Sequence, residues 1–301
     1  MKINIDAGHG SNTAGKRTPP MPQAIDIDKD GKVDIKKGEQ YREHYASVGV
    51  ASLLVRELER CGFATMRTGW NDANAADDPD TALTDRQAAI LKGKCDYSIS
   101  IHFNAYGDGV TFNTAEGVGV YIHDKYAGQS KKLAETVLKH LAGGAKQKNR
   151  GVTTGALAMC NCNTMGTKAA ILCELAFMTN LREATELMAN SAFWKECAQE
   201  ICKGVCEYTG TKYVPEVYIP TKTITPESSR EDIKWLQTKL NQCLNSTESF
   251  IPLTVDGSYG PKTRIAVLIY WERLGWGKHM KDDGTKAGKA TIEALATGRI
   301  K

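Results

Sequence analysis

Long apolar runs are missing from this sequence of 301 residues. No segment approaches the ~18 consecutive apolar residues of a membrane-spanning helix, so we do not expect the chain to span a membrane. Internal repeats and low-complexity stretches are missing as well. Hydrophobic residues make up 41% and charged residues 25% of the chain, as in ordinary globular proteins, and its length gives room for one large and one small domain.

A signal-peptide core is also lacking, since MKINIDAGHG leads from a short strand straight into Gly and His. The nine cysteines are an odd count, and several lie in apolar segments such as ILCELAF. We therefore expect a chain that is made in the cytoplasm with reduced thiols, rather than a disulfide scaffold. Cys202 and Cys206 have a zinc-like spacing, but we interpret them as two small apolar residues on one helix face.

The excess of positive charge lies in the last quarter of the chain. Residues 228–301 contain 12 Lys and Arg against 8 Asp and Glu, which accounts for the whole net charge of +4. This pattern predicts that the C-terminal part meets something anionic. A nucleic-acid partner is disfavoured, because the excess is small and no recognition motif accompanies it.

Strand and helix patterns alternate over residues 1–211. Runs rich in β-branched and aromatic residues predict strands at 2–6, 63–68, 97–103, 118–123 and 169–177. Longer amphipathic stretches predict helices at 42–62, 85–94, 126–144, 180–191 and 193–210. This alternation predicts an α/β domain with a central, mostly parallel or mixed sheet that is covered by helices on both faces.

The composition and periodicity of the sequence change after residue 211. Residues 212–228, rich in Pro and Thr, predict an extended linker. Residues 229–301 follow as a small all-α domain, and much of its core should come from three tryptophans, Trp235, Trp271 and Trp276. Its helical segments are 230–244, 260–276 and 288–298.

Three of the predicted strands carry residues suited to chemistry. His9 and His102 follow or end strands, and Glu174 lies inside an otherwise apolar run. The C-terminal edge of an α/β sheet is where ligands usually bind. A buried carboxylate needs a compensating charge or hydrogen bond, and perturbed groups of this kind cluster at functional sites. A structural role for each residue alone is the alternative.

Three motifs appear in order along residues 1–210: DAGHG, CDYSISIHFNA and ILCELAFMTNLREATELM. Together with the weaker echoes MRTGW, LTDRQAAI and NRGV, they resemble zinc-dependent N-acetylmuramoyl-L-alanine amidases of the amidase_3 type. The resemblance implies cleavage of the amide bond between N-acetylmuramic acid and the L-alanine of the peptidoglycan stem peptide. It also implies one catalytic Zn²⁺ ion.

The resemblance assigns the site residues one by one. His9 and His102 match the two zinc histidines, and Glu43 matches the glutamate ligand at the start of the first helix, with Glu39 as the alternative. Glu174 matches the catalytic glutamate. Two imidazoles and one carboxylate leave zinc an open position, as a catalytic site requires. The setting of Glu174 should raise its pKa, which suits a proton shuttle.

The chain departs from the family between His9 and Glu43, where the gap is longer than usual. Within it, Asp26, Asp28 and Asp30 imitate the opening of a calcium loop, but the twelfth position holds Lys37 instead of glutamate. We therefore interpret the stretch 26–38 as a solvated acidic insertion that shapes the substrate groove. A second loop, 158–167, contains Cys160 and Cys162, which we expect to be thiols without a catalytic role.

The second domain carries its own motif. LTVDGSYGPKTRIAVLIYWERLGW resembles the peptidoglycan-binding domain that is commonly fused to wall hydrolases. The turn itself is structural, because glycine permits it and proline starts the following helix. The resemblance leaves wall contacts to exposed groups nearby, for which we name Tyr259, Lys262 and Arg264.

These expectations describe a modular peptidoglycan hydrolase tethered to its insoluble substrate. The missing signal-peptide core and the expected reduced thiols resemble a phage endolysin, which acts on the wall after release; autolysins and spore-wall enzymes are alternatives. Two rival functions stay open: a zinc peptidase that cuts within the stem peptide, and a catalytically silent wall-binding protein. The oligomeric state is not specified by the sequence.

Overall fold

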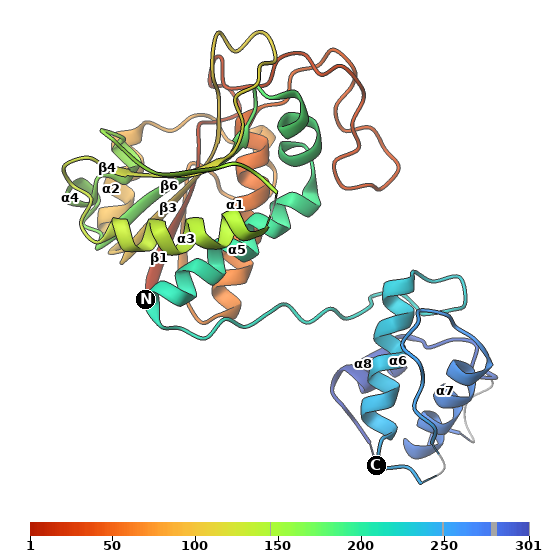
Figure 1. Cartoon of the computed structure of the whole chain (residues 1–301). Coiled ribbons are helices and arrows are strands. Elements are labelled where there is room, and N and C mark those ends of the chain that lie inside the picture. The colour runs from red at the N-terminus through yellow and green to blue at the C-terminus, as the bar shows by residue number, and fades with distance from the viewer. Residues whose placement is uncertain (145, 249, 278–281, 301) are drawn as a thin grey trace. The chain divides into compact units, whose positions relative to one another are not determined.

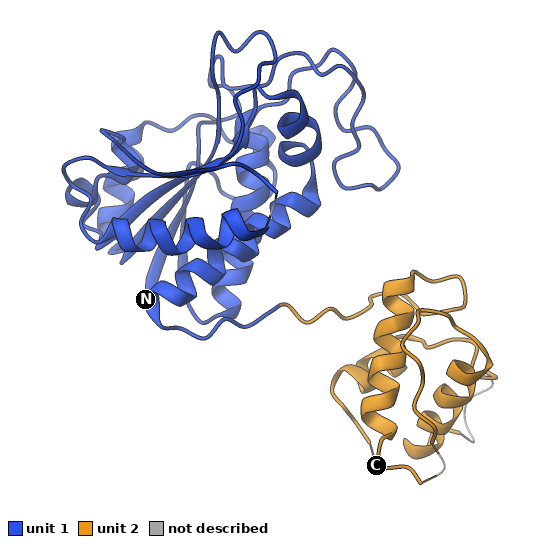
Figure 2. Ribbon diagram, in the orientation of Figure 1, with its two compact units in different colours: residues 1–215 blue, residues 216–301 orange. Residues whose placement is uncertain are grey.

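The computed structural model describes residues 1–144, 146–248, 250–277 and 282–300 (Figure 1). The chain divides into two compact units, Met1–Pro215 and Glu216–Lys301 (Figure 2). Among the helices of the described residues, none is both long and apolar enough to cross a membrane.

A six-stranded sheet forms the centre of the first unit, with strand order β2-β1-β3-β6-β4-β5. Neighbouring strands run parallel except β4 and β6, which are antiparallel. The predicted mixed α/β class is therefore confirmed. The strands are β1 (Lys2–Ala7), β2 (Ala64–Thr68), β3 (Tyr97–Asn104), β4 (Val118–His123), β5 (Asn149–Gly155) and β6 (Ala169–Phe177).

Helices cover both faces of this sheet (Figure 1). One face carries α1 (Glu43–Arg60), α3 (Ser130–Gly144) and α5 (Ser191–Thr209), and the other carries α2 (Leu83–Gly93) and the short α4 (Cys162–Met165). Helix α1 lies against the sheet because its apolar residues recur at helical spacing. Its buried side chains on that face include Val48, Ala51, Leu54, Val55 and Leu58.

Two predictions from the sequence differ from the structure. Strand β5 was not among the expected strands, because its sequence NRGVTTG is polar and largely exposed at the sheet edge. The helix expected at 180–191 is a shorter π-helical turn, Glu183–Met188. Glu183 is fully buried there and accepts hydrogen bonds from the backbone of Gly117 and Phe177, so its carboxylate is part of the fold. Two 3₁₀ turns, Ala75–Asp77 and Ala158–Cys160, complete the unit.

Strand register brings the candidate residues to one edge of the sheet. β1 and β3 are parallel, with Ala7 opposite Ile101. β3 and β6 are also parallel, with His102 opposite Glu174. Paired residues on adjacent strands project to the same face, and the C-terminal ends of β1, β3 and β6 therefore supply one site.

The second unit is helical, as the sequence predicts. Its helices are α6 (Arg230–Leu244), α7 (Pro261–Arg273) and α8 (Lys289–Ala296). Trp235 and Trp271 belong to its core, and Trp276 packs against that core while partly buried.

The expected linker is packed at both ends. Ile224 is fully buried in the core of the second unit and pairs with Ala287. At the other end, the Tyr213 hydroxyl donates to a carboxylate oxygen of Glu57 at 3.0 Å.

Candidate metal centre and active site

Three side chains from separate elements meet beyond the edge of the sheet. Nε2 of His9 lies 3.3 Å from one carboxylate oxygen of Glu43, and Nδ1 of His102 lies 2.9 Å from the other. The two imidazole rings stand edge to face with centroids 5.0 Å apart. One ligand atom from each residue lies within 4.8 Å of the others, which makes this group a candidate metal centre.

The end of β1 is shaped to bring His9 against His102. A Cβ atom on Gly8 would stand 2.4 Å from the His102 ring, so only glycine permits this close approach. His9 itself has a positive φ of 63°, which is uncommon for a residue with a side chain. A Cβ on Gly10 would lie 2.2 Å from the backbone nitrogen of Asp80. Steric crowding therefore requires glycine at both Gly8 and Gly10 of the GHG motif.

Glu43 enters the site from the first residue of α1 and is 1% exposed. Its Oε1 also accepts the backbone N–H of Phe103 at 3.1 Å. Burial acts to raise the pKa of Glu43, but the hydrogen bonds and charges of His102 and His9 hold that pKa well below its usual value. Burial acts to lower the pKa of His102, but its contacts with Glu43 leave that pKa raised. Glu39 precedes the helix and is exposed, so it does not share the face of Glu43.

Glu174 lies beside these residues with an unsatisfied carboxylate. Its Oε2 is buried and has no hydrogen-bond partner. Burial raises the pKa of Glu174 to about 7; Glu43 contributes to the rise, while His102 and Lys16 oppose it. A carboxyl group with this pKa exchanges a proton near neutral pH, as a general acid or base must.

Arg86 is a residue of the site to which the sequence assigned no role, although it lies in the LTDRQAAI motif. Arg86 is 2% exposed, and its guanidinium donates to the carbonyl oxygens of Ala7 and His9, at 2.7 and 2.6 Å. It also contacts the carboxylates of Asp6 and Asp80, at 3.1 and 3.0 Å. Arg86 therefore holds the backbone on both sides of the Gly8 turn, and its side chain position sets where His9 can stand.

His44 supports the same turn from the opposite side. Its Nδ1 lies 2.9 Å from the carbonyl oxygen of Gly8, and its Nε2 lies 3.5 Å from Oδ2 of Asp78. Both side chains are almost fully buried. The sequence offered only one signal for His44, its position next to Glu43.

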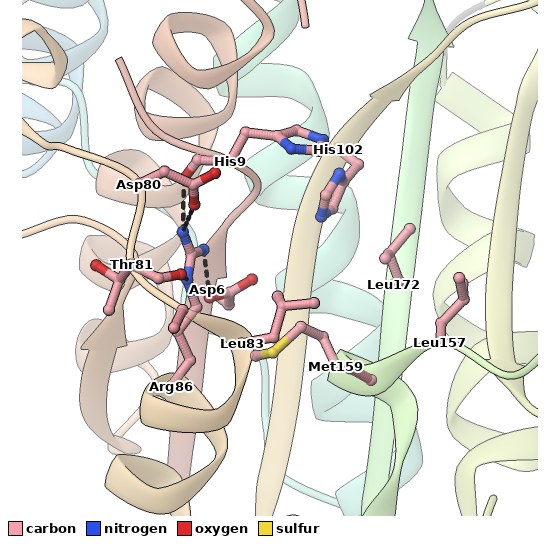
Figure 3. A pocket seen from close by; sticks show the side chains of 12 residues that line it. Asp6, His9, Asp80, Thr81, Leu83, Arg86, His102, Leu157, Met159 and Leu172 are labelled. Atoms are coloured by element: carbon pink, nitrogen blue, oxygen red, sulfur yellow. Dashed lines mark hydrogen bonds and ion pairs between the residues drawn. The ribbon is translucent and has the colours of Figure 1, made fainter. Parts of the chain in front are cut away.

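A cavity of about 540 Å³ opens next to His9 and His102 (Figure 3). Figure 3 shows Arg86 bonded to Asp6 and Asp80 at one side and Leu157, Met159 and Leu172 at the other. Part of this apolar wall, Met159, comes from the loop 158–167. Cys160 and Cys162 in that loop are buried, and burial raises the pKa of Cys160 to about 12, so its thiol is not a ready nucleophile.

The acidic insertion lies apart from this cavity, whose lining includes no residue of 26–38. That the insertion shapes the substrate groove stays a prediction. Asp26, Asp28 and Asp34 come within 4.8 Å of one another on an exposed loop, while Asp30 pairs with Lys32.

The three residues named in the second unit differ in their surroundings. Tyr259 donates its hydroxyl to the carbonyl oxygen of Gly284 at 2.8 Å, and Arg264 pairs with Asp283 at 2.7 Å. Lys262 is exposed and borders an apolar cavity of about 200 Å³.

Two imidazoles, a buried carboxylate and an unpaired second carboxylate at the C-terminal edge of an α/β sheet have the composition of a metal-dependent hydrolase site. Comparison with protein families specifies the class. The family model described as N-acetylmuramoyl-L-alanine amidase matches residues 3–207. The chain belongs to this family of N-acetylmuramoyl-L-alanine amidases.

Two curated relatives match the same part of the chain. The N-acetylmuramoyl-L-alanine amidase LytC of Bacillus subtilis (strain 168) is 31% identical over 207 residues, covering 68% of this chain and 35% of the relative. An uncharacterized cell wall amidase of Bacillus anthracis is 28% identical over 214 residues, with the same coverages of 68% and 35%. The chain thus spans about a third of the length of these relatives.

Solved structures share the fold. An N-acetylmuramoyl-L-alanine amidase from Clostridium difficile 630 superposes with a TM-score of 0.54 at 24% identity, over 70% of this chain and 98% of that one. The catalytic domain of the amidase CwlV from Bacillus (Paenibacillus) polymyxa var. colistinus gives 0.52 at 22% identity, over 70% and 99%.

Proposed function

We propose that the first unit is a zinc-dependent catalytic domain that hydrolyses the amide bond between N-acetylmuramic acid and the L-alanine of the stem peptide. The observation that carries this proposal is the meeting of His9, Glu43 and His102 beside the unpaired oxygen of Glu174. Membership in the amidase family supports the choice of substrate.

The donor set suits zinc. His9 and His102 offer ring nitrogens and Glu43 offers a carboxylate, within the reach that one ion requires. In such a site zinc polarises a carbonyl group and lowers the pKa of water. Three protein ligands leave room for substrate, unlike the four of a structural site. Phe103 and Arg86 hold Glu43 and His9 in place through backbone contacts.

Glu174 moves the proton. With its pKa raised by burial, the carboxylate accepts a proton from the attacking water and then donates it to the amine of the departing L-alanine. Its unpaired Oε2 leaves a lone pair free for this exchange. Positioned acid–base groups of this kind contribute roughly 10²–10⁴-fold to rates.

We propose that residues 212–228 connect the catalytic domain to a wall-binding domain, residues 229–301. The excess positive charge of the second unit and the exposed Lys262 support binding to an anionic wall polymer. Tethering keeps the catalytic domain at a high effective concentration near its insoluble substrate. Tyr259 and Arg264 already bond to the turn at 283–284, so Lys262 is the strongest of the three candidates.

We further propose a lytic role of the endolysin kind. All nine cysteines are free and buried, which suits synthesis in a reducing compartment before release.

Digestion of purified peptidoglycan, with and without a zinc chelator, tests the proposed activity. New L-alanine amino termini without new reducing sugars, lost on chelation and restored by zinc, would establish the amidase. Amino termini at another stem residue would identify a peptidase instead. Sedimentation with the wall without any new ends would leave a silent binding protein.

A further inference from the structure

Three cysteines from distant parts of the sequence meet in the first unit, away from the residues proposed for catalysis. Cys61 caps the C-terminal end of α1, while Cys202 and Cys206 lie one turn apart on α5. Their sulfur atoms all lie within 4.8 Å of one another, and the residues are between 0 and 8% exposed. The sequence showed only the Cys202–Cys206 pair; the tertiary structure adds the third sulfur.

The distance between the sulfur atoms fits two ligands of one metal ion better than it fits a disulfide bond. Sγ of Cys202 lies 3.7 Å from Sγ of Cys61. Two sulfurs each about 2.3 Å from a tetrahedral zinc ion stand about 3.8 Å apart. A disulfide needs about 2.05 Å, so this pair would have to approach by about 1.7 Å.

A backbone contact orients the sulfur of Cys61. The N–H of Val214 points at Sγ of Cys61 with an N···S distance of 3.3 Å. Metal-bound thiolates accept outer hydrogen bonds of this kind, which orient the ligand and tune the site.

The donor set decides the class of ion. Soft sulfur ligands select thiophilic ions, whereas Ca²⁺ and Mg²⁺ take oxygen ligands. Among the residues that the structure describes, these three sulfurs form the whole group, and no carboxylate or imidazole joins it.

We propose that Cys61, Cys202 and Cys206 form a second metal site, selective for a thiophilic ion of the Zn²⁺, Cd²⁺ and Cu⁺ class. The bound ion joins the C-terminal end of α1 to α5. It also holds the segment at Val214, where the chain leaves the first unit, next to the bond from Nε of Arg60 to the Val214 carbonyl. This site is independent of the proposed amidase chemistry.

Cadmium titration of the full chain tests the proposal, with a phosphine reductant present. A thiolate–cadmium charge-transfer band in the ultraviolet reports only sulfur ligation, and the group of His9, Glu43 and His102 contains no sulfur. We expect the band to saturate with one bound ion per chain in the wild type. Cys202→Ser and Cys206→Ser should abolish it.

Cys95→Ser is the matched control, because Cys95 is equally buried but lies next to Met66, outside the cluster. It should keep the band, and all three variants should keep wall hydrolysis and their far-ultraviolet circular dichroism. Absence of the band in the wild type, or its persistence in both Cys202→Ser and Cys206→Ser, overturns the proposal.

A second measurement needs no variant. In mild denaturant, cadmium should slow alkylation of Cys61, Cys202 and Cys206 in the wild type, relative to Cys243 in the second unit, as read by peptide mass spectrometry. Equal alkylation of all four with and without cadmium contradicts the proposal. The proposal is also contradicted if Cys61 and Cys202 form a disulfide in air and the cysteines do not bind cadmium after that disulfide has been reduced.

Discussion

Two buried side chains, Gln237 in the second unit and Glu174 in the first, differ in how completely they are hydrogen-bonded. In the second unit, Gln237 is 2% exposed and bonded at both ends: its Nε2 donates to Asp256 and its Oε1 accepts from Gly257. In the first unit, Glu174 keeps a buried carboxylate oxygen without a hydrogen bond. The hydrogen bonds of Gln237 hold the turn at Asp256 and Gly257 in place. The unpaired carboxylate oxygen of Glu174, beside two histidines, instead indicates a site where a ligand binds.

The largest effect should come from the unpaired carboxylate. Glu174→Gln removes the proposed proton shuttle and keeps the shape of the side chain, so wall hydrolysis should fall by roughly 10²–10⁴-fold. Zinc content, measured by elemental analysis, should not change, because Glu174 is not among the three proposed ligands. A variant within about tenfold of the wild-type rate would contradict the role of Glu174.

In the metal-free chain, Glu174→Gln should increase the stability of the fold, although it lowers the activity. Burial raises the pKa of Glu174 from 4.5 to about 7, so the folded state keeps this carboxyl protonated at pH values where the unfolded chain has lost the proton. The free energy of unfolding therefore falls as the pH rises from about 4.5 to about 7. Above about pH 8 the penalty is fully present, and Glu174→Gln should raise the free energy of unfolding by about 1–3 kcal/mol. Below about pH 4 the two proteins should unfold at nearly the same denaturant concentration.

Arg86→Lys tests the support of the metal centre. Lysine keeps the charge but cannot reach the carbonyl oxygens of Ala7 and His9 together with two carboxylates. Zinc affinity should fall by roughly 10–100-fold, as for other outer supports of a metal site. Saturating zinc should restore most of the hydrolysis rate. If activity is lost while zinc affinity is unchanged, Arg86 acts on substrate instead.

Gln237→Ala tests the buried side chain of the second unit that is hydrogen-bonded at both ends of its amide. It leaves the buried groups around the turn at Asp256 and Gly257 without partners, which should cost about 1–3 kcal/mol in the second unit. Calorimetry should show a lower melting temperature for that unit. Zinc binding and hydrolysis of soluble muropeptides should stay at wild-type values, since these depend on the first unit.

The smallest effect is expected on the surface. Lys262→Glu should weaken sedimentation with wall polymer by a few fold, with the loss shrinking as salt screens the charges. Lys289→Glu makes the same charge change on α8 and serves as the control. Equal losses in both variants would point to net charge, and no loss in either would remove Lys262 from the binding surface.

Much of the first unit was predictable because its strands are apolar and its helices periodic. Strands β4 and β6 match the predicted ranges, and helix α6 does as well. β5 was missed because an exposed edge strand needs no apolar alternation. The π turn at Glu183–Met188 was missed because its geometry depends on Glu183 bonding to residues far along the chain.

The sequence alone determined the class of fold, the order of the motifs and the residue types of the proposed site, because local patterns of burial and turn formation are written in consecutive residues. Only the tertiary structure decided which groups meet. It brought Glu43 rather than Glu39 to the histidines, placed Arg86 beneath His9 and joined Cys61 to Cys202 and Cys206. These contacts join residues far apart along the chain, and they exist only because packing of strands and helices fixes distances that no local pattern encodes.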